Sequence, residues 1–348
     1  MKASVLTEYG RLQWMECDTP GLSPNGVLIN VSCAGICGSD MHVFKGEFHP
    51  RTPLPLIMGH EFAGTIVDIG SEVSGFDIGD RVTVDPIFWC GHCPACERQH
   101  YPACSSLKLL GIDSNGGFGQ YVAAPEFMLY KLDDRIPDQH AALIEMLSIG
   151  FHACQRAGVQ PGDTLAIFGA GRIGQSILQA ARTITDNTIT LVDIVPNRLQ
   201  VASDIYDNVV PVNALEHDPA RAIAEATNGR GVDVALEAVG HPHPIEGRRH
   251  PVAECVDVVR GAGTVCVLGL GDTPVSLLMK DLIWKEVTVV ASRVTHGEFA
   301  KTIEHMSRGD LHPEALITRE MPACDAQQAF ELLLENPKDD LKILLHIA

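Results

Sequence analysis

The chain changes its pattern of hydrophobic and polar residues partway along its length. In the first part, short segments alternate between hydrophobic and polar positions and are separated by prolines and glycines, as in 26–31, 64–70 and 80–84. Alternation with a period of two, rich in β-branched residues, predicts half-buried strands. Several short strands at this spacing predict a partly barrel-like β domain over residues 1 to 85. A further β segment is expected at 117–125.

From residue 162 onward, short purely apolar runs alternate with segments of helical periodicity. Apolar runs of this kind are typical of parallel strands covered on both faces. The predicted strands are 164–168, 188–192, 207–212, 232–237 and 263–269. The predicted helices are 139–156, 175–182, 252–260 and 326–334. The alternation favours an α/β domain with a doubly wound sheet, and 348 residues suffice for two domains with separate cores.

A glycine-rich turn follows the first strand of this second region. It has the pattern G-x-G-x-x-G over 169–174 and lies between a predicted strand and a predicted helix. In that context the pattern predicts dinucleotide binding, with the pyrophosphate at the helix N-terminus. Asp193 ends the next strand and can accept hydrogen bonds from ribose hydroxyls, which favours NAD over NADP. The predicted coenzyme-binding residues are Gly169, Gly171, Arg172, Ile173, Gly174, Asp193 and Arg198.

Four cysteines lie close together in the first region. Cys90, Cys93, Cys96 and Cys104 have the spacing C-x2-C-x2-C-x7-C. Four thiolates with such short spacers can surround one zinc ion tetrahedrally and leave no position for a substrate, which predicts a structural site. The alternative is a group of reduced or disulfide-paired surface cysteines, which would be prone to oxidation.

A second possible metal site involves residues from three separate segments. His60 and Glu61, bracketed by Gly59 and Gly64, place an imidazole beside a carboxylate, a pairing that zinc accepts. Cys37 lies upstream and Glu145 downstream, in an apolar stretch where an ionised carboxylate is costly unless it is paired or bound to metal. The alternatives are a surface His-Glu pair and a helix whose solvent face carries Glu145.

Composition and charge exclude some partners. Hydrophobic residues make up 45% and charged residues 20%, and the formal net charge is -18. This acidic surface argues against nucleic acid or an anionic membrane as partner. Glu8 interrupts the N-terminal apolar stretch too early for a secretory signal, and Pro, Asn, Ser and Gly break the uncharged run 19–39, which is therefore no membrane span. We expect a cytoplasmic protein.

With these motifs, the chain resembles the zinc-dependent medium-chain alcohol/polyol dehydrogenases over essentially its whole length. The glutamate at Glu145, where other members of the family have a cysteine, resembles the sorbitol, threonine and butanediol dehydrogenase branch. The resemblance implies a GroES-like β-rich catalytic domain built from both ends of the chain, with a Rossmann NAD-binding domain inserted. The expected ranges are 1–147 and 288–348 for the catalytic domain, with a structural zinc lobe at 88–106, and 148–287 for the NAD-binding domain.

The resemblance also implies the roles of individual residues. The catalytic zinc is expected on Cys37 and His60, with Glu61 and Glu145 binding directly or through water. Ser39 and His42 match the family's proton relay, although both could be plain turn residues. Asp40 matches the carboxylate that orients the zinc-bound histidine. Arg293 matches an arginine that faces the substrate, while a surface or interface ion pair is equally compatible.

The function implied is oxidation of a secondary alcohol of a polyol, sugar alcohol or sugar acid to a ketone, with two zinc ions per chain and NAD. The expected catalytic residues are Ser39, His42, Glu61 and Arg293. The expected assembly is a homotetramer or a homodimer, with strands near 274–278 and at 287–291 as candidate interface elements. A threonine- or butanediol-type substrate is the alternative. A non-catalytic zinc- and nucleotide-binding relative would have lost the ligands or the relay, and a zinc-free enone reductase would lack both zinc motifs.

Two features depart from the family pattern. Met146 stands where the family usually has a proline after the glutamate, which bears on the direction of Glu145. The segment 241–251 is longer than usual and contains three histidines and three prolines. We expect a polar surface loop there, because the prolines prevent a regular backbone, and a further metal site is the alternative.

Overall fold

The computed structural model describes residues 1–242, 247–336, 338 and 340–347, and divides the chain into two compact units. Unit 1 comprises Met1–Glu145, Thr295–Gly309 and Pro313–Ala348, and unit 2 comprises Met146–Val294 and Asp310–His312. The first boundary lies two residues before the expected one. The second lies seven residues after the expected one, because the strand 288–291 pairs in the sheet of unit 2.

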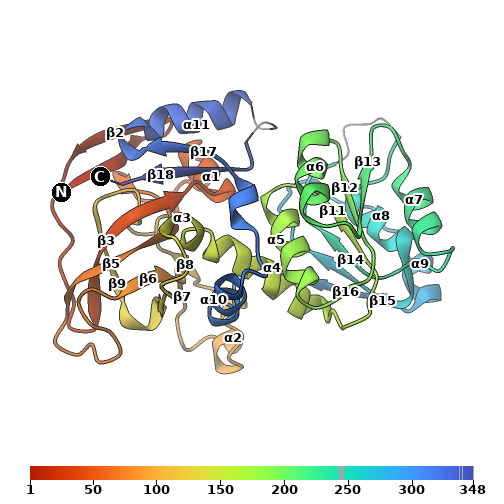
Figure 1. The fold of residues 1–348 in the computed structure, drawn as a ribbon, viewed down its shortest axis with the longest axis horizontal. Helices are drawn as coiled ribbons and strands as arrows, with labels where there is room; N and C mark the ends of the chain where they lie inside the picture. Colours follow the sequence, from red (N-terminus) through yellow and green to blue (C-terminus); the bar gives the residue numbers. More distant parts are fainter. Residues whose placement is uncertain (243–246, 337, 339, 348) are drawn as a thin grey trace. The chain divides into compact units, whose positions relative to one another are not determined.

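Unit 1 is built mainly from antiparallel strands, and both chain ends belong to it (Figure 1). Its largest sheet has seven strands in the order β10-β6-β5-β3-β18-β17, with β9 also pairing β3. A three-stranded sheet β2-β1-β4 and a two-stranded sheet β7-β8 complete the strands of the described part. The strands are β1 Lys2–Glu8, β2 Arg11–Glu16, β3 Gly26–Gly35, β4 Leu56–Ile57, β5 Glu61–Ile69, β6 Arg81–Val84, β7 Ile87–Phe88, β8 Lys108–Leu109, β9 Tyr121–Pro125, β10 Leu129–Lys131, β17 Ile317–Pro322 and β18 Lys342–His346.

The helices of unit 1 are short. They are α1 Gly38–Phe44, α2 Pro94–Glu97, α3 Asp138–Ala141, α10 Phe299–Arg308 and α11 Ala326–Glu335, with 3-10 turns η1 Tyr101–Ala103, η2 Glu126–Met128, η3 Pro313–Leu316 and η4 Ala323–Asp325. Strand β18 pairs β3 with Leu344 opposite Gly35, and β3 in turn pairs β5 with Gly35 opposite Glu61. These three central strands therefore bring residues near 35, 61 and 342 into one region.

Unit 2 contains a six-stranded parallel sheet in the order β13-β12-β11-β14-β15-β16. Helices α5 and α6 lie on one side of the sheet, and α7 and α8 on the other (Figure 1). The elements are α4 Ile144–Ala157, which begins at the boundary, β11 Leu165–Phe168, α5 Arg172–Arg182, β12 Ile189–Asp193, α6 Pro196–Ile205, β13 Val209–Asn213, α7 Pro219–Ala226, β14 Val232–Glu237, α8 Pro251–Val258, β15 Val259–Val267, α9 Met279–Lys285 and β16 Thr288–Ala291. This is the doubly wound architecture predicted from the apolar runs.

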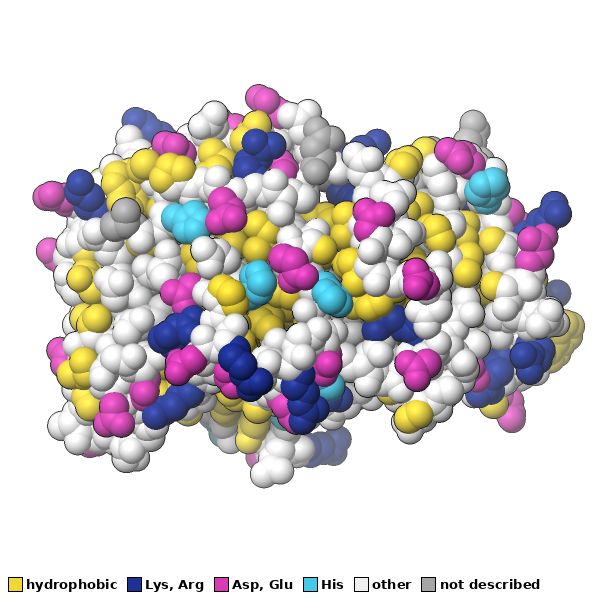
Figure 2. All heavy atoms as spheres, viewed as in Figure 1, with side chains coloured by type: hydrophobic (Ala, Val, Ile, Leu, Met, Phe, Trp, Pro, Cys, Tyr) yellow, Lys and Arg dark blue, Asp and Glu magenta, His cyan; other side chains and the backbone are white. Residues whose placement is uncertain are grey.

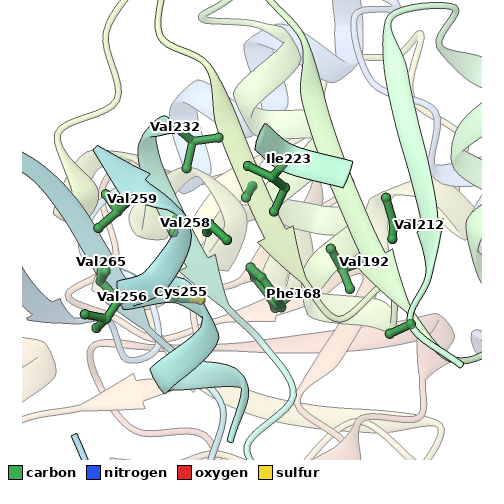
Figure 3. Close-up of a cluster of buried hydrophobic side chains, with 13 residues drawn as sticks. Phe168, Val192, Val212, Ile223, Val232, Cys255, Val256, Val258, Val259 and Val265 are labelled. Carbon is green, nitrogen blue, oxygen red and sulfur yellow. The ribbon is translucent and has the colours of Figure 1, made fainter. Parts of the chain in front are cut away.

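The core of unit 2 lies between the sheet and the pair α7 and α8. Cys255 and Val256 of α8 and Ile223 of α7 pack toward Phe168 and Val192 of the central strands, and all are buried (Figure 3). Parallel strands that are covered by helices bury both faces, which explains their uninterrupted apolar sequences.

Two predicted elements differ from the structure. The helix expected at 139–156 is two helices, α3 and α4, so that Glu145 lies in the first turn of α4 rather than in the middle of a helix. The strand-like segment 274–278, which we considered as an interface element, forms no strand. Among the described residues it pairs with no strand, and sequence alone does not reveal this.

Acidic and basic side chains are interspersed over the face shown in Figure 2. Among the described residues, no helix combines the length and the apolar composition needed to cross a bilayer.

Candidate active site

Unit 1 brings three of the predicted catalytic-zinc ligands together. Ligand atoms of Cys37, His60 and Glu61 all lie within 4.8 Å of one another. Cys37 precedes α1, His60 precedes β5, and Glu61 is the first residue of β5. His60 is 2% exposed and Glu61 is fully buried. Gly59 allows this turn, since its φ is +91° and a Cβ there would lie 2.3 Å from the Phe118 ring. We call these three residues the open centre.

Asp40 connects two of these ligands. Its Oδ2 accepts a hydrogen bond from the backbone N–H of Cys37 at 2.8 Å, and its Oδ1 lies 3.4 Å from Nδ1 of His60. Burial alone would lower the pKa of His60, but the negative charges of Asp40 and Cys37 outweigh burial and raise it. The negative groups around His60 therefore favour a positive charge at this position, and a bound zinc ion would supply one.

Glu145 lies outside the group of three, although it is close enough to feel their charges. It is 3% exposed, and burial raises its pKa to about 8, an effect that the nearby charge of His60 opposes. Among the described residues its Oε2 has no hydrogen-bond partner. A buried carboxyl oxygen without a partner, beside a thiol, an imidazole and a second carboxylate, is a donor set that fits zinc.

The two predicted relay residues occupy different environments. The Ser39 hydroxyl lies 3.2 Å from Nε2 of His60, which places it at the open centre. His42 is exposed, its ring stacks on Phe48 with centroids 5.8 Å apart, and its Nδ1 contacts the Glu47 carboxylate. This contact leaves Nε2 of His42 as the nitrogen available to exchange a proton.

The four cysteines of the predicted lobe also meet in unit 1. Sulfur atoms of Cys90, Cys93, Cys96 and Cys104 lie within 4.8 Å of one another. The Cys93–Cys96 and Cys90–Cys96 sulfur separations are 3.5 Å and 3.9 Å. Sulfur atoms around a tetrahedral zinc are about 3.8 Å apart, because each Zn–S distance is about 2.3 Å. The cluster therefore has the size of a closed zinc site, and we call it the four-cysteine lobe.

The protonation of these thiols also suits a cation. Backbone hydrogen bonds, first of all at Cys96, lower the pKa of Cys93 to about 5, whereas burial raises the pKa of Cys96 to about 12. Four thiolates at these separations repel one another, so all four can ionise only if a metal ion lies between them. The residues of the lobe fit zinc on this ground as well as by size.

The glycine loop of unit 2 leaves space for a phosphate to approach its backbone closely. Gly169 has φ of +99°, and a Cβ on Gly174 would lie 1.7 Å from the Gly169 carbonyl oxygen. Gly171 precedes α5, in which Arg172 and Ile173 are the first residues and are half-buried. Backbone N–H groups at the start of α5 are thereby free of side chains that would obstruct a phosphate.

Asp193 ends β12 and contacts this loop. Its Oδ2 accepts from Ala170 N at 2.6 Å, and its Oδ1 accepts from Ile194 N and Val195 N at 2.7 and 2.9 Å. Arg198 is half-buried near the loop, since its Nη1 lies 3.8 Å from a Cβ built on Gly171. The structure thus brings the predicted coenzyme residues together.

Two remaining predictions concern surface positions of unit 2. Arg293 is exposed and follows β16. In the segment 241–251, residues 243–246 lie outside the described residues. Of the rest, His250 caps α8 through Val252 N, and Arg248 bonds Glu254 and the Ala214 carbonyl oxygen. The described part of this segment forms hydrogen bonds within unit 2 and contributes to no group of potential metal ligands.

The sequence interpretation missed one residue at the open centre. Lys342, the first residue of β18, is fully buried, and its Nζ lies 2.5 Å from Oε2 of Glu61. No motif indicates a lysine of this kind. A charge within an otherwise apolar C-terminal strand was the only available signal.

Comparisons with known proteins give the family. Residues 23–134 match the alcohol dehydrogenase GroES-like domain, and residues 173–308 match the zinc-binding dehydrogenase domain. The chain is 31% identical to sorbitol dehydrogenase of Bacillus subtilis, over 99% of this chain and 97% of that protein. It is 32% identical to L-idonate 5-dehydrogenase of Vitis vinifera, over 90% and 86%.

Solved structures agree over the whole chain. An alcohol dehydrogenase (rspB) from Escherichia coli CFT073, complexed with NADH, has a TM-score of 0.90 at 28% identity and covers 100% of this chain and 99% of its own. A putative zinc-binding dehydrogenase from Sinorhizobium meliloti 1021, bound to NADP, has a TM-score of 0.91 at 28% identity, with 99% and 98% covered. The chain belongs to the zinc-dependent medium-chain alcohol/polyol dehydrogenases.

Proposed function

We propose that this protein oxidises a secondary alcohol of a polyol, sugar alcohol or sugar acid to a ketone, with NAD as hydride acceptor. The observation that carries the proposal is the open centre, where a thiol, an imidazole and a carboxylate converge while Ser39 stands beside them. The sorbitol and idonate dehydrogenases among the relatives support this substrate class. A threonine- or butanediol-type alcohol is the alternative within the same chemistry.

Cys37, His60 and Glu61 would hold the catalytic zinc, with Glu145 binding it directly or through water. When bound, zinc supplies a Lewis acid that lowers the pKa of a substrate hydroxyl. Ser39 would accept the hydroxyl proton, and His42 would pass it to solvent, since its ring is exposed and held by Phe48 and Glu47. Asp40 would keep the His60 ring in orientation.

The coenzyme is proposed to be NAD, with its pyrophosphate at the glycine loop and its ribose at Asp193. A carboxylate at this place repels a 2′-phosphate. Asp193→Asn removes the charge and keeps one oxygen, which can accept either from Ala170 N or from Ile194 N and Val195 N. The ratio of kcat/KM with NAD to kcat/KM with NADP should fall. A wild-type enzyme that uses NADP as well as NAD would contradict the ribose assignment.

The substrate class can be tested with a panel of polyols, sugar acids, amino alcohols and simple alcohols, followed by NADH formation. Arg293 is proposed to bind substrate hydroxyls or a carboxylate. A site furnished with such partners rejects substrates that lack them by up to about 10^4-fold in kcat/KM. A preference for simple primary alcohols would contradict the substrate class. Unchanged rates in Arg293→Ala would exclude Arg293 from the substrate site but leave the substrate class standing. If no alcohol of the panel gave NADH, the protein would instead be a non-catalytic relative.

We further propose a homotetramer, or a homodimer, joined through unit 2. Strand β16 is an edge of the six-stranded sheet, and the neighbouring helix α9 is apolar on its surface. Exposed hydrophobic residues in this region are Leu270, Leu278, Met279, Ile283, Trp284 and Val289. Apolar surface of this extent is typical of an interface. Light scattering should give a mass that is a multiple of the 37.6 kDa of one chain, and Trp284→Lys should lower the measured mass.

Two zinc ions per chain are proposed, one at the open centre and one in the four-cysteine lobe. Thiolate ligands remain available only where thiols stay reduced, which supports a cytoplasmic location. Metal analysis of the active enzyme tests the count. One zinc per active chain, with no gain on adding zinc, would contradict it.

A further inference from the structure

His42, the outer residue of the proposed relay, has a carboxylate at one of its two ring nitrogens. Its Nδ1 contacts the Glu47 carboxylate, and both side chains are 48% exposed. An exposed ion pair of this kind contributes little to stability. It does decide which ring nitrogen carries the proton of the neutral imidazole, because an ionised carboxylate only accepts and the nitrogen that faces it must donate. The contact therefore bears on proton transfer more than on folding.

The backbone at the end of α1 places Glu47 beside His42. The N–H of Glu47 donates to the His42 carbonyl oxygen at 2.9 Å. The N–H of Gly46 donates to the Val43 carbonyl oxygen, also at 2.9 Å. These two bonds form a Schellman motif, which returns the residue after the turn to the last turn of the helix. Gly46 is required there, because its φ is +77° and a Cβ would lie 2.8 Å from the Tyr9 ring. The backbone turn thus fixes the partner of His42.

A second set of contacts holds the plane of the His42 ring. The Phe48 ring stacks on it, with centroids 5.8 Å apart and an angle of 22° between the planes. The Arg51 guanidinium lies 5.8 Å from the centroid of Phe48. Arg51 is itself anchored to Asp113 by two bonds, Nε to Oδ1 at 2.8 Å and Nη2 to Oδ2 at 2.6 Å. Asp113 is 9% exposed and also accepts from Leu109 N at 2.8 Å. The ring is therefore held both at Nδ1 and on one face.

The charges around this contact keep Glu47 ionised. The hydrogen bond from His42 lowers the pKa of Glu47 below its ordinary value. Lys45 favours the same form, since its Nζ lies 3.9 Å from the carboxylate oxygen that does not contact the ring. An ionised carboxylate has no proton to give, so the proton between the two side chains belongs to Nδ1 of His42. In the neutral ring, Nε2 is then the nitrogen with an available electron pair.

We propose that Glu47 is a positioning residue of the reaction, which holds the ring proton of His42 on Nδ1 and so keeps Nε2 ready to receive the relayed proton. The inference rests on the proposed dehydrogenase function. In this step a proton leaves an oxygen of the relay and an N–H bond forms at Nε2, and the imidazolium then releases that proton to a water molecule. The Nδ1–H bond stays intact throughout, and Glu47 stabilises the positive ring while it exists. Glu47 acts through His42 and not on the substrate.

The tautomer of His42 can be measured without substrate. Nitrogen NMR spectra of the histidine-labelled full chain are recorded at a pH at which His42 is neutral, and its signals are assigned by their loss in His42→Gln. The wild type should show the Nδ1–H tautomer, and Glu47→Gln should lose this preference, because its amide can also donate to Nδ1. Glu8→Gln is the matched control, since Glu8 is an exposed glutamate of unit 1 that pairs with Arg11. An unchanged tautomer in Glu47→Gln would overturn the proposal.

Kinetics test whether this tautomer matters for the reaction. Glu47→Gln should lower kcat about tenfold with little change in KM, because a proton on the wrong nitrogen removes part of the general-base catalysis. In the His42→Gln background the same substitution should have no further effect, since the ring that Glu47 positions is absent. An equal effect in both backgrounds would overturn the proposal and leave Glu47 a structural role. A wild type that oxidises no alcohol would overturn the proposed function separately, because the tautomer measurement needs no substrate.

Discussion

The two candidate metal centres of unit 1 differ in how the chain builds them. The four-cysteine lobe takes all its ligands from one segment of 15 residues, Cys90 to Cys104, around two short helical turns. The open centre takes Cys37 from the turn before α1 and His60 and Glu61 from the start of β5, and Lys342 of the last strand contacts Glu61. The lobe depends on local chain geometry, whereas the open centre depends on the whole sheet.

The chemistry of the two centres differs in the same way. The lobe offers four identical ligands that together neutralise and enclose a zinc ion. The open centre offers three different ligands, a nearby Ser39 hydroxyl and a buried ammonium that contacts the Glu61 carboxylate. A site with uniform ligands retains its metal, and a site with mixed and shared ligands can exchange one of them for substrate. Matched substitutions in the two centres test this contrast.

The largest expected effect comes from removing one thiolate in each centre. Cys37→Ala should lower kcat by about 10^3-fold or more, since a Lewis acid contributes several kcal/mol to the barrier, with the Tm nearly unchanged. Cys96→Ala should lower the Tm by on the order of 10 °C, because zinc binding to a structural site is folding free energy, and reduce kcat of the folded enzyme less than about tenfold. Kinetics, calorimetry and metal analysis on both proteins test the contrast. Equal loss of activity with no change in Tm for Cys96→Ala would contradict it.

A chelator should separate the centres in the wild type. The first equivalent of zinc should leave the open centre, and activity should disappear with it while the circular dichroism spectrum stays native, since only this centre has a position that solvent can occupy. The second equivalent should leave later, together with loss of structure. Zinc release followed by a colorimetric dye, sampled in parallel for activity, gives the order. Simultaneous release of both ions would show that the lobe is not closed.

The same contrast explains how much of the site the sequence predicted. The four cysteines and the glycine loop form patterns within about 15 residues, and the structure brings each group together. Cys37, His60 and Glu61 come from two segments. Their residue types suggested a metal site, but the alternatives stayed open until the resemblance to a family supported it. Lys342 carries no pattern, because its role arises from the pairing of β18 with β3. The expected boundary at 287 differs from the boundary at 294 for the same reason, because β16 belongs to unit 2 only through its pairing with β15.

A smaller effect is expected from the carboxylate that connects two ligands of the open centre. Asp40→Asn keeps the shape and weakens the contacts to Cys37 N and His60 Nδ1. Loss of such an outer partner typically lowers metal affinity or activity by about 10- to 100-fold. Asp218→Asn is the matched control, because Asp218 also accepts from a backbone N–H but caps α7 in unit 2. If both variants changed activity equally, Asp40 would have no special function at the centre.

The smallest expected effect concerns Asp85, a buried carboxyl that contacts a hydroxyl instead of a metal. It is 8% exposed and lines a cavity of about 200 Å³ together with Trp89, which precedes the lobe, and Tyr101, which lies between two of its cysteines. Thr295 Oγ1 lies 3.2 and 3.1 Å from its two carboxylate oxygens. Burial raises its pKa to about 7, against the effect of the Thr295 hydrogen bond.

The sign of the resulting pH dependence follows from this raised pKa. A carboxyl whose pKa is higher in the folded than in the unfolded chain stabilises the fold fully below its unfolded pKa of about 4, and this contribution is lost as the pH rises through about 7. Between pH 6 and pH 8, the wild type should lose on the order of 1 kcal/mol through Asp85. Asp85→Asn cannot ionise and keeps an oxygen for Thr295, so it should flatten this part of the profile. The measurement is denaturant unfolding of the zinc-loaded protein at both pH values, with the exposed Asp68→Asn as control. A profile equally steep in Asp85→Asn would mean that the carboxyl does not titrate between pH 6 and pH 8, so that burial beside the lobe does not place its pKa in this range.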